Sequence, residues 1–201
     1  MNKDWIVEEK IISLEVPITF WEFQLPETPE YSRDFLHSEI ERIIRETGDK
    51  RGRTTNVKAI MTEWLMTHHA PFKFICDNVE DIIKSWYSEK TSLTLETFMT
   101  TCWGSIYSKG DYAERHAHVP ALHAWVYYAK VNSNSAPLFF PNAPTYTYKP
   151  RSGYGIIFPG WLVHETPIHQ SDDERIIVVG NVEGTGAVEY PQKRNFLHVT
   201  G

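Results

Sequence analysis

A short segment in the second half of the chain concentrates histidines. The stretch "ERHAHVPALHAWVYY", residues 114–128, holds three of the nine histidines, His116, His118 and His123, within eight residues. One residue separates His116 from His118, so both side chains point to the same face if the segment is extended. Imidazole is a frequent ligand of first-row transition metals. The segment is therefore either part of a metal site at a strand edge or an ordinary histidine-rich loop.

A third ligand would have to come from another part of the chain. His164 in "FPGWLVHETP" is the best candidate, because it directly follows an apolar strand-like run and a turn. Three protein ligands on one face of an octahedral ion leave three positions open for substrate and oxygen. The remaining histidines have no partner in the sequence pattern, and we interpret them as structural: His37, His68, His69, His169 and His198.

An arginine follows at a spacing that could serve the same site. Arg175 in "ERIIVVGN" comes eleven residues after His164. If the strands carrying these two residues are antiparallel neighbours, the guanidinium points back into the same cavity. A guanidinium binds a carboxylate through two parallel hydrogen bonds, so it could anchor a dicarboxylate co-substrate. Alternatively, Arg175, which follows "DDE", forms a solvated ion pair at the start of a strand.

Two segments upstream of residue 90 have the pattern of amphipathic helices. Residues 29–47 carry apolar side chains at three-to-four-residue spacing, with Pro29 near the start and Gly48 after the end. Residues 71–88 repeat the pattern and begin at Pro71. We expect both helices to pack outside one sheet of the part of the chain that follows.

Downstream of residue 90 the chain consists of short β-rich runs separated by turns. "SLTLETFMTTCWGSIYS", "LHAWVYYAKV", "PLFF", "IIFPGW" and "RIIVVGNVE" are the clearest of these runs. Closely spaced short strands favour an antiparallel sandwich or barrel over alternating βαβ units. We interpret the protein as mainly β with flanking α-helices. It is expected to form a single domain over residues 1–201, with a helical part, 1–90, supporting a β core, 91–201, that carries the site.

Composition restricts the classes of partner. The chain has 201 residues, 41% of them hydrophobic, and a formal net charge of −6. Because "KRGR" at residues 50–53 is the nearest approach to a basic block, nucleic acid is an unlikely partner. Only two cysteines are present, Cys76 and Cys102, and no run approaches membrane-spanning length. The beginning of the sequence also lacks the apolar core of a signal peptide, so we expect a cytoplasmic protein without membrane contact.

Four motifs together resemble a known enzyme family. "YSKGDYAERHAH", "VYYAKV", "FPGWLVHETP" and "ERIIVVGN" are similar, in order and spacing, to motifs of the iron(II)- and 2-oxoglutarate-dependent oxygenases. The small bacterial and phage branch that is similar to prolyl hydroxylases is the nearest match, over residues 100–182. The resemblance implies a double-stranded β-helix, which is a jelly-roll sandwich.

The resemblance also implies roles for individual residues. His116 would be the first iron ligand, His164 the distal ligand, and Arg175 the anchor of the 2-oxoglutarate C5 carboxylate. Tyr107 and Tyr128 match tyrosines that contact 2-oxoglutarate in prolyl-hydroxylase-like members. Further aromatic residues flank these motifs and would line the pocket mouth or pack in the core: Trp103, Tyr112, Trp125 and Trp161.

One position departs from the family pattern. His118 stands where most of the superfamily has Asp or Glu, and a neutral imidazole there raises the net charge of the site by one. Imidazole ligands suit zinc and nickel as well as iron. Three nearby carboxylates could complete the metal shell instead: Asp111, Glu114 and Glu165. His123 stands where relatives have a small residue, so we interpret it as a packing or pocket-lining residue.

The activity implied by the resemblance is that of a dioxygenase. Iron(II), 2-oxoglutarate and molecular oxygen would be used to hydroxylate a small-molecule or peptide substrate, with release of succinate and carbon dioxide. The alternatives are a cupin-like metal-binding or zinc protein without oxygenase activity, and a structural β-sandwich with no site. Arg175 and the two tyrosines distinguish the first possibility, because a metal-binding module does not need a carboxylate anchor.

Overall fold

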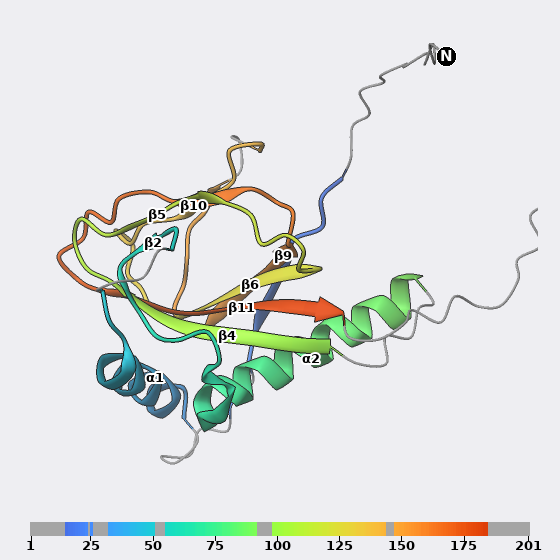
Figure 1. Cartoon of the computed structure of the whole chain (residues 1–201), viewed down its shortest axis with the longest axis horizontal. Helices are drawn as coiled ribbons and strands as arrows, with labels where there is room; N and C mark the ends of the chain where they lie inside the picture. Colours follow the sequence, from blue (N-terminus) through green and yellow to red (C-terminus); the bar gives the residue numbers. More distant parts are fainter. Residues whose placement is uncertain are drawn as a thin grey trace, which may run out of the picture.

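Two β-sheets face each other, and two helices cover the outer side of one of them (Figure 1). The computed structural model describes residues 15–23, 25, 32–50, 55–91, 98–143 and 147–184. The strand pairs within both sheets are antiparallel. Two antiparallel sheets packed face to face form a jelly-roll sandwich, which confirms the predicted fold class.

The large sheet supplies most of the rigid framework. In spatial order its strands are β1 (Thr19–Glu22), β9 (Tyr154–Pro159), β6 (His123–Lys130), β11 (Arg175–Gly184), β4 (Phe98–Tyr107) and β3 (Ile60–Met61). β11 pairs with β4 along its whole length, from Arg175 opposite Tyr107 to Gly184 opposite Phe98. These strands are long and rich in β-branched and aromatic residues, which favour extended structure.

The small sheet consists of short strands. In spatial order they are β2 (Val57–Lys58), β5 (Tyr112–His116), β10 (His164–Thr166), β7 (Leu138–Phe139) and β8 (Thr147–Tyr148). β5 and β10 lie side by side at the centre, with His164 directly opposite His116. Two parts of the chain that are far apart in sequence therefore place histidines at one position of this sheet.

Two helices and one 3₁₀ turn precede the longest strands. They are α1 (Arg33–Thr47), η1 (Met66–His68) and α2 (Ala70–Thr91). Ser32 caps α1 by accepting a hydrogen bond from the backbone N–H of Phe35. Gly48 follows α1 with an extended φ, and a Cβ there would lie only 2.6 Å from the Ile44 carbonyl oxygen. Within the described residues, no helix is long and apolar enough to cross a membrane.

The hydrophobic core has two layers, one on each face of the large sheet. Alternate residues of β11 face opposite ways, so Ile176 and Val178 pack toward the helices while Ile177 and Val179 face the small sheet. The helices contribute buried residues to the outer layer, among them Ile40, Ile44, Phe72 and Val79. Because both faces of the sheet are covered, its central strands read as continuous apolar runs.

The predicted helices are present and lie outside the large sheet, as expected. α1 begins at Arg33, because Ser32 supplies the cap, while residues 29–31 lie outside the described residues. The description of residues 1–90 as helical was incomplete, since β1, β2 and β3 also fall in this part. β2 and β3 have only two residues each. So short a strand cannot show the alternating pattern by which strands are recognised in sequence.

Candidate metal centre

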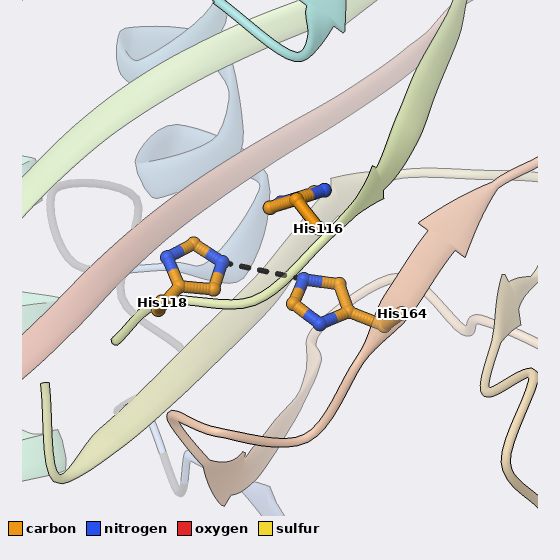
Figure 2. Close-up of side chains that lie close together, drawn as sticks. All are labelled: His116, His118 and His164. Atoms are coloured by element: carbon orange, nitrogen blue, oxygen red, sulfur yellow. Dashed lines mark hydrogen bonds between the residues drawn. The ribbon is translucent and has the colours of Figure 1, made fainter. Parts of the chain in front are cut away.

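Three histidine side chains converge between the two sheets. His116 ends β5, His164 begins β10, and His118 lies two residues beyond the end of β5. Each offers one ring nitrogen, and these three atoms lie within 4.8 Å of one another. Figure 2 shows the rings of His118 and His164 turned toward each other, with His116 beside them. Within the described part of the chain, these three histidines form the group of side chains that could hold a metal ion.

His118 reaches the group from a loop and not from a strand. We expected His116 and His118 to share one face of an extended segment, but β5 ends at His116. The loop is held by the backbone, because the N–H of His118 donates to the Gly160 carbonyl at 2.7 Å. The ring of His118 also stacks on that of Trp103, with 6.0 Å between centroids and 27° between planes. The convergence therefore depends on the contact between two loops.

Backbone carbonyls fix the proton positions of two of the rings. Nδ1 of His116 lies 2.6 Å from the carbonyl oxygen of Glu114, and Nδ1 of His164 lies 2.8 Å from that of Leu162. A carbonyl can only accept, so both Nδ1 atoms carry hydrogen and both Nε2 atoms present a lone pair. Nε2 of His164 lies 3.2 Å from Nε2 of His118. Two nitrogens about 2.1 Å from one ion would be about 3.0–3.4 Å apart, so this separation suits a metal site.

The three rings are neutral at physiological pH. Burial lowers the pKa of His118 to about 4 and that of His164 to about 3, and it also lowers the pKa of His116. The other rings of the group lower the first two values further, because a second positive charge nearby is unfavourable. An ion can therefore bind at pH 7 without displacing protons from imidazolium groups.

The carboxylates named as alternative ligands are engaged elsewhere. Asp111 accepts a hydrogen bond from Lys50 at 2.8 Å, and Glu165 accepts one from Arg115 at 2.9 Å. Glu114 is exposed and lies 3.6 Å from the Lys58 ammonium. The described residues thus bring three imidazoles together without a carboxylate.

Arg175 enters the same cavity from the opposite sheet. The strands that carry His164 and Arg175 are not neighbours, because β10 belongs to the small sheet and β11 to the large one. Arg175 is only 1% exposed and pairs in register with Tyr107. Its position at the start of β11, on the face toward the small sheet, directs it across the sandwich toward the histidines.

The guanidinium of Arg175 lies among aromatic rings, and no carboxylate of the described residues pairs with it. Its Cζ lies 4.8 Å from the ring centroid of Tyr107 and 5.4 Å from that of Tyr128. Nε and Nη1 of Arg175 and the hydroxyl of Tyr128 are buried without a hydrogen-bond partner. Burial raises the pKa of the Tyr128 phenol, although Arg175 opposes the shift, so the phenol stays protonated. Unsatisfied donors around a buried cation are costly unless an anion binds them.

One pocket connects the histidines with the arginine. Its volume is about 380 Å³, including the open mouth. His116, His118, His164, Tyr107 and Arg175 supply its polar lining together with Thr166. The other lining residues are largely apolar: Val57, Trp103, Ala113, Val126, Leu138, Ile177 and Val179. The three histidines and the buried guanidinium therefore line one and the same pocket.

Several residues named from sequence lie away from the pocket, and one polar lining residue was missed. His123 faces α2, where its ring meets that of Trp86 at 6.2 Å. Trp125 is buried in the layer beneath the helices, and Trp161 is 54% exposed. Thr166 is buried and lines the pocket. It is two residues from His164, so alternation along the strand could have identified it.

Comparisons with known sequences do not identify a family. No family model matches the chain, and no curated protein sequence is significantly similar to it. Any relationship therefore has to be sought in three-dimensional structure.

Solved structures do match. A prolyl-4-hydroxylase from Pseudomonas putida superposes with a TM-score of 0.61 and 17% identity, covering 84% of this chain and 93% of that one. The chain has the prolyl-hydroxylase fold. The viral collagen prolyl hydroxylase of Paramecium bursaria Chlorella virus-1, in complex with 2-oxoglutarate, shares this fold with a TM-score of 0.56 and 16% identity. That match covers 84% of this chain and 96% of the viral one.

A third structure extends the comparison beyond prolyl hydroxylases. An oxidoreductase of the 2OG-Fe(II) oxygenase family from Burkholderia pseudomallei superposes with a TM-score of 0.56 and 13% identity. The superposition covers 86% of this chain and 88% of the Burkholderia protein. The three matches cover 84–86% of this chain and 88–96% of the other proteins.

Proposed function

We propose that this protein is an iron(II)- and 2-oxoglutarate-dependent dioxygenase that hydroxylates a small-molecule or peptide substrate. The observation that carries the proposal is the buried guanidinium of Arg175, in the pocket that also holds three histidines. Its Nε and Nη1 have no hydrogen-bond partner among the described residues. A metal-binding module needs the histidines alone. A buried cation across the cavity is explained by an anionic ligand that reaches from the metal to the opposite wall.

The donor set fits both groups. His116, His118 and His164 would hold the metal through lone pairs that are available at neutral pH. Arg175 and the hydroxyl of Tyr128 would bind the distal carboxylate of 2-oxoglutarate, and the ring of Tyr107 would pack against the guanidinium. Protonated donors in a pocket shielded from water form strong hydrogen bonds to a carboxylate.

Iron(II), when bound, would supply oxygen activation coupled to the decarboxylation of 2-oxoglutarate to succinate and hydroxylation of the substrate. The chain's own residues bind, orient and shield the reactants. Arg175 sets the direction of the dicarboxylate, and apolar residues such as Ile177, Val179 and Leu138 keep water from the space between arginine and histidines. The fold supports this function, since one of the similar structures is a 2-oxoglutarate complex.

The test is calorimetric titration of the Mn(II)-loaded protein with 2-oxoglutarate under anaerobic conditions. Arg175→Met keeps most of the side-chain volume but removes the charge and the hydrogen-bond donors. We expect metal binding to persist and 2-oxoglutarate binding to weaken by about 2–4 kcal/mol, which is typical of losing a buried charged partner. Arg115→Met, which removes an exposed arginine, is the matched control and should bind as wild type does.

Two outcomes would contradict the proposal. Equal 2-oxoglutarate affinity in wild type and Arg175→Met would remove the arginine from the co-substrate site. Metal binding without any 2-oxoglutarate binding in either protein would favour the cupin-like or zinc-protein alternative.

A further inference from the structure

The three imidazoles of the site are not held in the same way. His116 and His164 each direct Nδ1 to the carbonyl oxygen of the residue two positions earlier in the chain. These contacts keep hydrogen on Nδ1 and leave Nε2 free for a metal. In the described part of the chain, His118 has no such contact with a backbone carbonyl. Figure 2 shows its second ring nitrogen on the side away from the other two rings.

The side chain of Asn181, on β11, is near enough to the ring of His118 to interact with it. Asn181 lies on the same face of β11 as Ile177 and Val179, which is the face toward the inside of the sandwich. Val179, its neighbour on that face, is paired with Trp103 on β4. The ring of His118 stacks on Trp103, so Asn181 belongs to the wall behind His118. Oδ1 of Asn181 is buried and accepts no hydrogen bond of standard geometry.

We infer that Asn181 is a positioning residue for the metal site: its side-chain oxygen accepts the Nδ1 hydrogen of His118 and thereby presents Nε2 to the ion. This inference rests on the proposed metal site but not on 2-oxoglutarate chemistry. It follows from the replacement of a carboxylate by an imidazole at position 118. A carboxylate can bind metal through either oxygen, whereas an imidazole has two tautomers, of which one places N–H where the metal should be.

The inferred contact also explains why an amide follows two apolar residues on the same face of β11. Ile177 and Val179 precede Asn181 on the same face of β11 and pack in the inner core. An unpaired buried amide oxygen costs free energy, and the Nδ1–H of a metal-bound His118 would satisfy it. Ligand histidines nearly always donate their second ring hydrogen to such an acceptor.

The experiment compares three variants of the full chain with wild type by two measurements. The first is a Co(II) titration monitored by visible absorption. The second is NMR of the Zn(II)-loaded protein labelled with ¹⁵N-histidine. Asn181→Leu removes the acceptor and keeps the volume. We expect Co(II) affinity to fall about 10- to 100-fold, the usual effect of losing such a partner. The Nδ1–H signal of His118 should be protected from exchange in wild type and become rapidly exchanging in Asn181→Leu.

Asn181→Asp should restore both the Co(II) affinity and the protection of the His118 Nδ1–H from exchange, because aspartate has an oxygen acceptor in both terminal positions. Thr101→Val, at the residue paired with Asn181 on β4, is the control and should leave both unchanged. If Asn181→Leu kept the wild-type Co(II) affinity and the wild-type exchange rate of the His118 Nδ1–H, the inference would be overturned but the proposed metal site would stand. Failure of the wild-type protein to bind Co(II) or Zn(II) would overturn the metal site and the inference together.

Discussion

At the scale of single residues, the candidate site combines neutral imidazoles with one buried cation. The rings of His118 and His164 have a strongly lowered pKa, so they contribute lone pairs and no charge. Arg175 contributes a positive charge without a carboxylate partner among the described residues. The site therefore has an excess of positive charge even before a metal binds, which favours a doubly negative ligand such as 2-oxoglutarate.

Replacing His118 by aspartate tests the effect of the missing carboxylate. His118→Asp would create two imidazoles and one carboxylate, a harder set of ligands that favours Mn(II) over Ni(II). We expect the ratio of Mn(II) to Ni(II) affinity to rise by about tenfold or more relative to wild type. Competitive titration against a chromogenic chelator measures both affinities. His123→Asn, at a histidine that faces α2, is the control, and an unchanged ratio in His118→Asp would show that His118 is not a ligand.

At the scale of secondary-structure elements, each contact that builds the site joins distant parts of the chain. β5 and β10 bring His116 opposite His164, and β11 carries Arg175 on the facing sheet. The large sheet is in turn supported by α1 and α2, whose apolar faces cover it. One polar contact lies in this outer layer, where Nε2 of His37 on α1 is 2.9 Å from the hydroxyl of Tyr127 on β6.

The contact of His37 predicts a pH dependence of stability. Burial, with a smaller effect of Arg33, lowers the pKa of His37 from 6.5 to about 4. Between these values the unfolded chain binds more protons than the folded one, so stability falls as pH decreases from about 6.5 to about 4. The buried triad histidines act in the same direction. Between about pH 6.5 and pH 4 the free energy of unfolding should therefore fall less in His37→Gln than in wild type. We expect the difference to be about 1–2 kcal/mol, allowing for partial exposure of the ring.

Urea unfolding of the metal-free protein at pH 7 and pH 4.5 measures this difference. His68→Gln, at the exposed histidine that ends η1, is the matched control and should show the wild-type loss of stability. A His37→Gln variant with the full wild-type loss of stability would show that His37 is not responsible.

At the scale of the whole molecule, strands from the first third of the chain complete both sheets. β1 pairs with β9, β3 pairs with β4, and β2 pairs with β5. We propose that residues 1–201 form a single cooperative domain, because neither sheet is complete without these strands. The site lies between the sheets, so it can form only when the whole sandwich has folded.

This proposal predicts a single unfolding transition, and binding of a metal ion should move the whole transition to higher urea concentration. Tryptophan fluorescence and far-ultraviolet circular dichroism should give coincident urea curves. Zn(II) at about 100 times its dissociation constant should add about 2.7 kcal/mol to the free energy of unfolding. Two separate transitions, with only one of them sensitive to zinc, would contradict a single domain.

Much of the fold could be predicted from sequence, because its signals are local. The apolar spacing of Ile40 and Ile44 indicated a helix, and "RIIVVGNVE" indicated a buried strand. The motifs also indicated which residues to consider, namely His116, His118, His164 and Arg175. Their side-chain types and spacing suggested metal and carboxylate binding without any knowledge of neighbours in space.

Only the tertiary structure determined how those residues meet. It placed β10 and β11 in opposite sheets and brought His118 in from a loop held by Gly160. It also buried Arg175 away from the carboxylates of the described residues. It also placed Asn181 on the same face of β11 as Ile177 and Val179, toward the inside of the sandwich. The physical reason is that periodicity reports how one segment is exposed. Pairing between strands about fifty residues apart depends on packing across the whole sandwich, which no local pattern encodes.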